Sequence, residues 1–164
     1  GKKATGIELE DGTTVPAGIV VANADLPYVY RELLRDKCYT AWLDKMKYSC
    51  SAISFHWALD KIYPGLGLHN VFMSEHYKHN LDQIFRDKKV SDDPSFYVFC
   101  PRETDPGSAP EGGDTISVIV PVGHLHKKNK GQWEAIREQV RKRVIERLDK
   151  QGLKDLELHI KFEK

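Results

Sequence analysis

The stretch SCSAISFHWAL at residues 49–59 alternates between apolar side chains and small or polar ones. Its apolar positions Ile53, Phe55, Trp57 and Leu59 lie two residues apart, and successive side chains of a strand point to opposite faces of a sheet. The pattern predicts a β-strand with one strongly apolar, aromatic face. Such a face must be covered, so we expect this strand to organise the core.

Three shorter segments further along the chain also have the composition of strands. They are His69–Met73, Phe96–Cys100 and Thr115–Val122; in the last, Ile116, Val118, Val120 and Val122 alternate with Ser117, Ile119 and Pro121. Turn-forming sequences separate these segments, the longest being the loop 105–113, which is rich in Gly and Pro. We expect the strands to pair in an antiparallel sheet.

Helical spacing of apolar residues marks the elements that should pack on this sheet. One such segment is Tyr77–Phe85. The clearest helix starts near Gly131 and ends at Gly152, with an apolar face made of Trp133, Ile136, Val140, Val144 and Leu148. We expect its other face to be solvated, with Glu138 and Lys142 as an i,i+4 pair. That face carries Glu134, Glu138, Arg141, Lys142 and Arg147. A last apolar stretch runs from Leu153 to Phe162.

The first 25 residues have a different pattern. Glu10-Asp11-Gly12 is a hairpin signal, and the run Ile19–Ala22 predicts a short strand buried on both faces, because its apolar residues do not alternate. The run ends at Asn23-Ala24-Asp25, a polar strand end of the kind at which α/β sheets place ligands, with a plain strand-to-helix turn as the alternative. Asp25 is expected to cap a helix over Leu26–Leu34.

Composition excludes several classes of function. The 164 residues carry a formal net charge of +1 with both signs interspersed, so the positive field that nucleic acid needs is missing. No apolar run approaches the ~20 residues that cross a bilayer. Cys38, Cys50 and Cys100 lack a Cys-x-x-Cys spacing, which favours reduced, buried thiols in an intracellular protein over a disulfide framework or a catalytic thiol.

Motifs for common chemistries are missing or incomplete. Gly65-Leu66-Gly67 lacks the third glycine and the following helix of a dinucleotide site, and neither a phosphate loop nor a Gly-x-Ser-x-Gly elbow occurs. The pairs His76/His79 and His124/His126 lack an evident third ligand, so we expect ordinary histidines and no metal. Arg102 with Asp105 is either an acid and its partner or, more simply, a loop staple.

Bulky aromatic residues gather on the predicted strands. They are Phe55, Trp57, Phe72, Phe96 and Tyr97. They suffice to line a wall for a large apolar ligand, and we take Phe55, Trp57, Phe72 and Tyr97 as candidate substrate contacts. Core packing is the alternative, because period-2 alternation fixes which residues share a face and not what that face meets.

Taken in order along the chain, several segments resemble the carotenoid desaturases of the phytoene desaturase type, most closely the fungal enzymes. These segments are Gly6–Gly12 with Ile19–Asp25, Lys47–Trp57, His69–Phe72, Asp93–Val98, Asp105–Gly112 and Val120–His124. The resemblance covers nearly the whole chain. Its most specific part runs from Asp93 to His124.

The resemblance implies an FAD-dependent oxidoreductase that acts on CH–CH groups and introduces double bonds into the colourless C40 polyene phytoene. It implies that residues 1–25 belong to a Rossmann-like FAD-binding domain and residues 26–164 to a polyene-binding domain. The expected fold class is therefore α+β: an antiparallel substrate-domain sheet with packed helices, plus a hairpin and strand of the FAD domain. Ala22, Asn23 and Asp25 then lie beside the cofactor.

This sequence lacks the family's glycine-rich nucleotide motif and its flavin-closing C-terminal segment, so we expect an inactive internal segment of a longer enzyme, with the catalytic residues elsewhere. A C40 hydrocarbon resides in the bilayer, which places that enzyme at an intracellular membrane surface. No oligomeric state is implied. The alternatives are another two-domain flavin oxidoreductase, amine-oxidase-like or retinol-saturase-like, and a self-contained α+β binding module.

Overall fold

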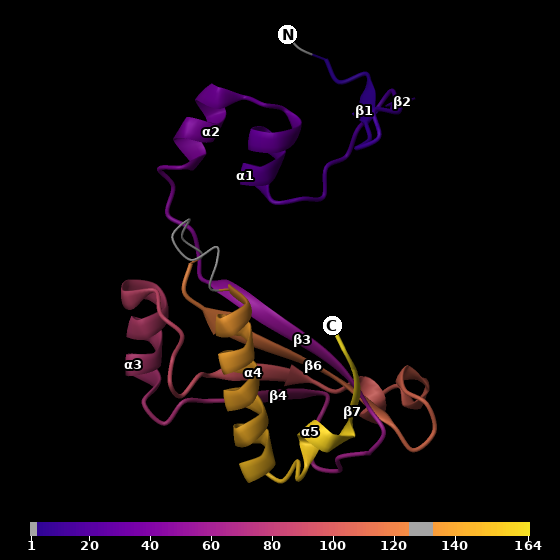
Figure 1. Cartoon of the computed structure of the whole chain (residues 1–164), viewed down its shortest axis with the longest axis vertical. Helices are drawn as coiled ribbons and strands as arrows, with labels where there is room; N and C mark the ends of the chain where they lie inside the picture. The colour runs from indigo at the N-terminus through magenta and orange to yellow at the C-terminus, as the bar shows by residue number, and fades with distance from the viewer. Residues whose placement is uncertain (1–2, 125–132) are drawn as a thin grey trace. The chain divides into compact units, whose positions relative to one another are not determined.

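The computed structural model describes residues 3–124 and 133–164, which divide into two units, residues 1–47 and 48–164 (Figure 1). In the second unit, five strands pair antiparallel in the order β4-β5-β6-β3-β7. Their bounds are β3 Ser51–Leu59, β4 His69–Phe72, β5 Phe96–Phe99, β6 Asp114–Val122 and β7 Ile160–Glu163. The predicted α+β class and antiparallel sheet are confirmed.

The longest ladder joins β3 to β6 and defines the core. Its register sets Phe55 opposite Val118 and Trp57 opposite Ile116. Residues directly opposite in a ladder share a face, and all four side chains are fully buried, so they form the centre of one side of the sheet. The apolar and aromatic face predicted for residues 49–59 is therefore the core face.

Helix α4, Trp133–Lys150, covers that side of the sheet (Figure 1). Its contributions to the core are Val140, Val144, Ile145 and Leu148, joined by Leu156 of α5, Leu156–His159. The predicted start at Gly131 lies outside the described residues. The predicted end is confirmed, because the chain turns at Gly152 with φ of 107°, a left-handed conformation that favours glycine.

A second helical segment follows β4. Helix α3, Tyr77–Asp82, continues as a π-helical turn, η2, Gln83–Asp87, and the chain then passes through Lys88 in a left-handed conformation. Lys88 lies against the end of β6 at Gly123, where a Cβ atom would approach the Lys88 Cα to 2.6 Å. Only glycine fits there without displacement of the backbone. Two short 3-10 turns, η3 Pro101–Glu103 and η4 Pro106–Ser108, shape the loop before β6.

The first unit begins with the predicted hairpin, β1 Gly6–Glu8 and β2 Thr14–Pro16, whose turn contains Gly12 at φ of 84°. The predicted helix over 26–34 forms as α1, Leu26–Tyr28, and a π-helical turn, η1, Val29–Leu33. Helix α2, Lys37–Leu43, was not predicted. Its signal is the cap: the Asp36 carboxylate accepts from the Tyr39 N–H at 3.0 Å.

Two predictions for the first unit need correction. Residues 19–22 form no strand in the described chain, and Ile19 and Val21 are 84% and 86% exposed. A strand exists only when a neighbour completes its hydrogen-bond ladder, and no described segment does so here. Asp25 occupies the cap position of α1, but its carboxylate makes no capping bond; its main-chain carbonyl accepts from the Val29 N–H.

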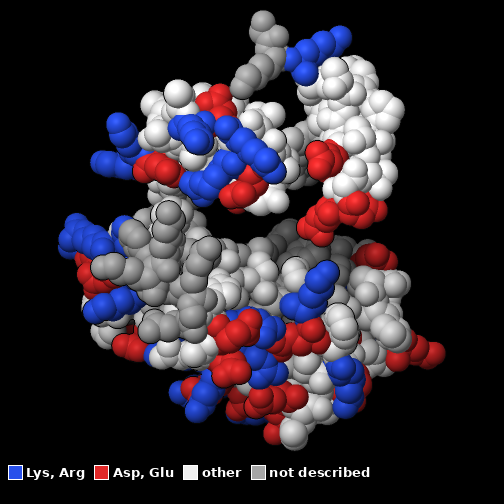
Figure 2. All heavy atoms as spheres, turned by 45° about the horizontal axis from the view of Figure 1, so that its top comes forward, with Lys and Arg blue, Asp and Glu red and all other residues white. Residues whose placement is uncertain are grey.

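The surface carries both signs of charge. Figure 2 shows Lys and Arg interspersed with Asp and Glu over the face in view, in keeping with the net charge of +1. Among the helices of the described ranges, none combines the length and the apolarity needed to cross a membrane. The first unit extends to Lys47, whereas the domain boundary between residues 25 and 26 stays a prediction.

Candidate functional site

The sheet has a second face, opposite α4, and part of it forms an apolar groove. The ladders place Val71 opposite Tyr97 and Tyr97 opposite Ile119, so these three side chains form a row across β4, β5 and β6. Helix α3 and the turn η2 form the facing wall. The groove has a volume of about 470 Å³. It is lined by Cys50, Val71, Met73, Tyr77, Asn80, Leu81, Ile84, Phe85, Ser95, Phe96, Tyr97, Ile119 and Pro121.

The groove is apolar because the strands do not alternate fully between apolar inward-facing residues and polar outward-facing ones. In β6 the outward positions hold Ser117, Ile119 and Pro121 rather than charged residues, and Ile119 is exposed. Val71, Tyr77 and Phe85 are also exposed, which makes this a continuous apolar surface of the kind that marks a binding site. An elongated apolar molecule fits such a surface by burial alone, without a polar anchor.

The candidate substrate contacts divide between the two faces. Phe55 and Trp57 are 0% exposed and belong to the core under α4, so the expectation of direct contact with a ligand is corrected to core packing. Phe72 also packs against that core and stacks on Phe96 with ring centroids 4.8 Å apart. Tyr97 alone of the four lines the groove.

Tyr97 is held in place by a polar contact at its tip. Its hydroxyl lies 2.6 Å from Nδ1 of His69 on the neighbouring strand. The two rings also stack, with centroids 6.0 Å apart. The ring of Tyr97 therefore presents an apolar surface to the groove from a fixed position.

Arg141 and Arg147 were expected on the solvated face of α4, but they instead bind α4 to β7 and to the segment before β5. Glu163 of β7 accepts from the Trp57 indole N–H at 2.8 Å, and it also accepts from Arg137 and Arg141 at 2.6 Å each. Arg147 donates to the Asp93 carboxylate and to the carbonyls of Pro94 and Met73.

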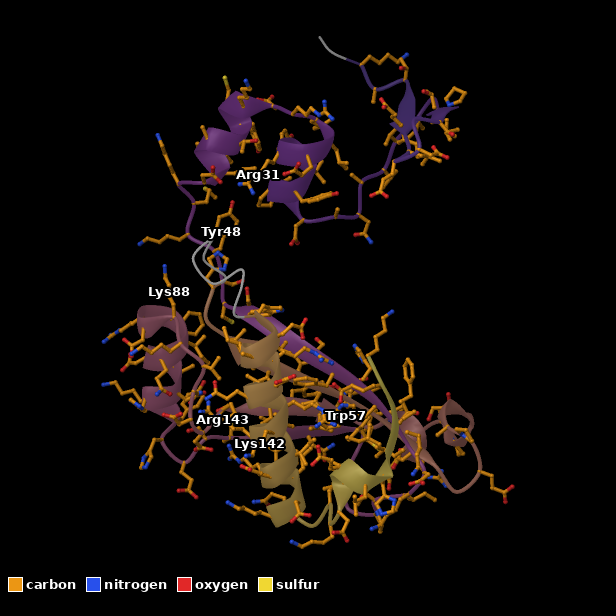
Figure 3. The ribbon with its side chains drawn as sticks, in the orientation of Figure 1. Arg31, Tyr48, Trp57, Lys88, Lys142 and Arg143 are labelled. Atoms are coloured by element: carbon orange, nitrogen blue, oxygen red, sulfur yellow. The ribbon has the colours of Figure 1, made fainter. Side chains whose placement is uncertain are left out.

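The predicted Glu138–Lys142 pair is replaced by Lys142–Glu146 at 3.9 Å. Figure 3 shows Lys142 and its neighbour Arg143 on α4; Arg143 donates to Asp92 at 2.6 Å. The periodicity of α4 predicted which residues share a side of the helix. The periodicity could not predict that carboxylates from distant parts of the sequence lie against the arginines of α4.

The loop before β6 is stapled by two separate bonds. Arg102 donates to the Gly113 carbonyl at 2.6 Å, and the Asp105 carboxylate accepts from the Gly107 N–H at 3.0 Å. Each residue thus has a main-chain partner, which supports the loop-staple interpretation and removes the acid-and-partner one.

The expectation of buried cysteines holds for Cys100 but not for Cys38, which is exposed, or for Cys50, which is partly exposed. All three cysteines are free, and burial, with a contribution from Asp114, raises the pKa of the Cys100 thiol to about 11. A thiol with that pKa is a poor nucleophile at neutral pH. In the described ranges no three His, Cys, Asp or Glu side chains gather as metal ligands. His124 packs against Tyr48, and its predicted companion His126 lies outside the described residues.

A flavin site is not complete within the described residues. Ala22, Asn23 and Asp25 are exposed in an irregular segment. The pyrophosphate of FAD needs main-chain N–H groups of a glycine-rich turn that opens a helix, whereas Gly65-Leu66-Gly67 leads into strand β4. Gly65-Leu66-Gly67 therefore does not provide the turn that binds the pyrophosphate.

No protein-family model matches the chain. Among curated proteins, the chain is 47% identical over 129 residues to a phytoene desaturase of Fusarium fujikuroi, an alignment that covers 79% of this chain and 23% of that protein. It is 41% identical over 153 residues to a phytoene desaturase of Phycomyces blakesleeanus, covering 92% of this chain and 26% of that protein.

A third relative comes from a bacterium. The chain is 38% identical over 165 residues to a protein of Myxococcus xanthus named zeta-carotene-forming phytoene desaturase, covering 100% of this chain and 31% of that protein. The chain thus spans about a quarter of the length of the curated relatives it matches. Identity of this extent over most of its residues shows common ancestry, and the chain is therefore a homologue of the phytoene desaturases, the carotenoid desaturase family that its motifs resemble.

Proposed function

We propose that this chain is part of an FAD-dependent carotenoid desaturase that introduces double bonds into phytoene or a similar C40 polyene. In this proposal the groove between α3, η2 and the outer face of the sheet receives a length of the polyene. The observation that carries it is the continuous row Val71, Tyr97 and Ile119, an apolar surface that the core does not use, in a homologue of phytoene desaturases.

A hydrocarbon offers the protein no polar handle, so its affinity must come from burial of apolar surface, at about 25 cal/mol per Å². The groove meets this need because its wall is almost entirely aliphatic and aromatic. The described wall residues include no carboxylate, lysine or arginine that would lose hydration when a polyene lies against it.

The roles proposed for the two domains follow from the family resemblance. When bound, FAD supplies the acceptor for a hydride from the polyene. Residues 1–25 belong to the FAD-binding domain, where Ala22, Asn23 and Asp25 lie near the cofactor, and residues 26–164 belong to the polyene-binding domain. The exposed apolar run at 19–22 supports the first assignment, because such a run is normally buried against a neighbouring strand.

The chain's own part in the reaction is to position the substrate. The groove holds the polyene in one orientation and excludes water from the carbons that it covers. Since the substrate is dissolved in the bilayer, the protein that contains this chain works at a membrane surface.

The test uses the protein that contains this chain, purified and supplied with phytoene in liposomes and an electron acceptor. We expect bound flavin and conversion of phytoene to more conjugated, coloured products. The variant Ile119→Asp places a charge in the groove at an exposed position, and it should lower the rate at least about tenfold. Leu158→Asp, an equally polar change at an exposed residue outside the groove, is the matched control. A flavin-free protein, or equal rates for the two variants, would contradict the proposal.

A further inference from the structure

The groove contains a buried polar side chain that has no hydrogen-bond partner in the described part of the chain. Asn80 of α3 is 1% exposed and lines the groove beside Leu81 and Ile84. Within residues 3–124 and 133–164, neither its Nδ2 nor its Oδ1 atom has a hydrogen-bond partner, while its main-chain N–H donates to the His76 carbonyl. A buried amide in this state is unfavourable, because it has given up its hydrogen bonds to water and gained none in return.

The position of Asn80 on its helix directs it toward the strands. Asn80 and Ile84 are four residues apart, so they share one helical face, and both are buried and line the groove. The segment that carries Ile84 is the π-helical turn η2, a conformation that often occurs at functional sites.

Other polar groups of the groove wall have partners or reach solvent. The Tyr97 hydroxyl contacts His69 Nδ1, and the Ser95 hydroxyl accepts from the Ser74 N–H at 3.0 Å. Tyr77 is half exposed, so its hydroxyl has access to water. Asn80 therefore stands out among the described wall residues as the buried amide with unused hydrogen-bonding capacity.

We propose that the groove accepts a hydroxylated isoprenoid, with the hydroxyl on Asn80 and the hydrocarbon chain along Val71, Tyr97 and Ile119. This inference rests on the proposed function of the groove, and it adds an isoprenoid alcohol as a ligand beside the hydrocarbon polyene. A hydroxyl satisfies both halves of the amide, because it accepts from Nδ2–H and donates to Oδ1. An aldehyde satisfies only the donor, and a hydrocarbon satisfies neither.

The test compares three C15 isoprenoids that differ at one end: farnesol, farnesal and β-farnesene. Each is titrated into the 15N-labelled chain, and the NMR signals of the Asn80 side-chain amide and of the Val71 and Ile119 main-chain amides are followed. We expect farnesol to bind about 10- to 100-fold more tightly than β-farnesene, with farnesal between them. Only the oxygenated ligands should shift the Asn80 amide protons.

The variant Asn80→Leu keeps the size of the side chain and removes its polarity. It should abolish the preference for farnesol and leave β-farnesene binding as tight or tighter, whereas the control Leu81→Met should change all three affinities alike. Equal affinities in the unmodified chain, or a preference that survives in Asn80→Leu, would refute the inference and leave the polyene groove standing. If none of the ligands shifts Val71 or Ile119, the groove binds no isoprenoid, and the proposed function of this surface fails together with the inference.

Discussion

Replacing Glu163 by alanine tests whether the contacts between β7, β3 and α4 hold the second unit together. Glu163 lies directly opposite Trp57 in the ladder, and its carboxylate accepts three hydrogen bonds, from Trp57, Arg137 and Arg141. Its side chain is only 17% exposed, and that of Trp57 is fully buried. Removing the carboxylate therefore leaves the buried Trp57 N–H without its acceptor and takes one carboxylate partner from Arg137 and from Arg141.

The expected loss follows from these contacts. A buried indole N–H left without a partner costs about 1–3 kcal/mol. Arg137 and Arg141 lose a carboxylate at 2.6 Å, but both are partly exposed and can turn toward water, so their share is smaller than for a fully buried pair. We expect Glu163→Ala to lower the free energy of unfolding by about 2–4 kcal/mol, and Glu163→Gln, which keeps an acceptor for Trp57, by about 1–2 kcal/mol.

Equilibrium urea unfolding followed by circular dichroism measures both losses. Glu157→Ala is the matched control, because Glu157 makes one bond to the same Arg141 but is 65% exposed; it should cost no more than about 1 kcal/mol. In a double-mutant cycle with Trp57→Phe, the coupling energy should reach about 1–3 kcal/mol. If Glu163→Ala and Glu157→Ala cost the same, or the coupling is zero, the carboxylate does not organise this region.

Two further predictions concern the core and its rim. Gly123→Ala should destabilise the second unit by about 1–3 kcal/mol, because the new Cβ would lie 2.6 Å from the Lys88 Cα; Gly67→Ala, whose Cβ meets nothing closer than 3.9 Å, is the control in the same urea assay. The pKa of Cys100 is raised from 9.0 to about 11 by burial, so the unfolded chain loses this proton first as the pH rises. Stability should be intact below pH 9 and fall between pH 9 and about 11, and Cys100→Ala should flatten that decline; an identical decline in the variant would refute the assignment.

Much of the second unit could be predicted from local pattern. The period of two in residues 51–59 and 114–122 depends only on which side of a strand each side chain occupies, and the period of 3.6 in α4 is equally local. The strand predicted at 19–22 failed because pairing needs a neighbour. The polar bonds of Arg141 and Arg147 were missed because their carboxylates lie far away in the sequence.

The sequence by itself determined strands β3 to β6, the main helix, the hairpin and the relationship to phytoene desaturases, since all of these depend on local spacing and residue order. Only the tertiary structure decided what each face of the sheet meets. Once α4 covers Phe55 and Trp57, that side is core, and the less conspicuous row of Val71, Tyr97 and Ile119 remains open. Alternation separates two faces, but the assignment of one to the interior depends on which helix packs where, and that is a property of the whole chain.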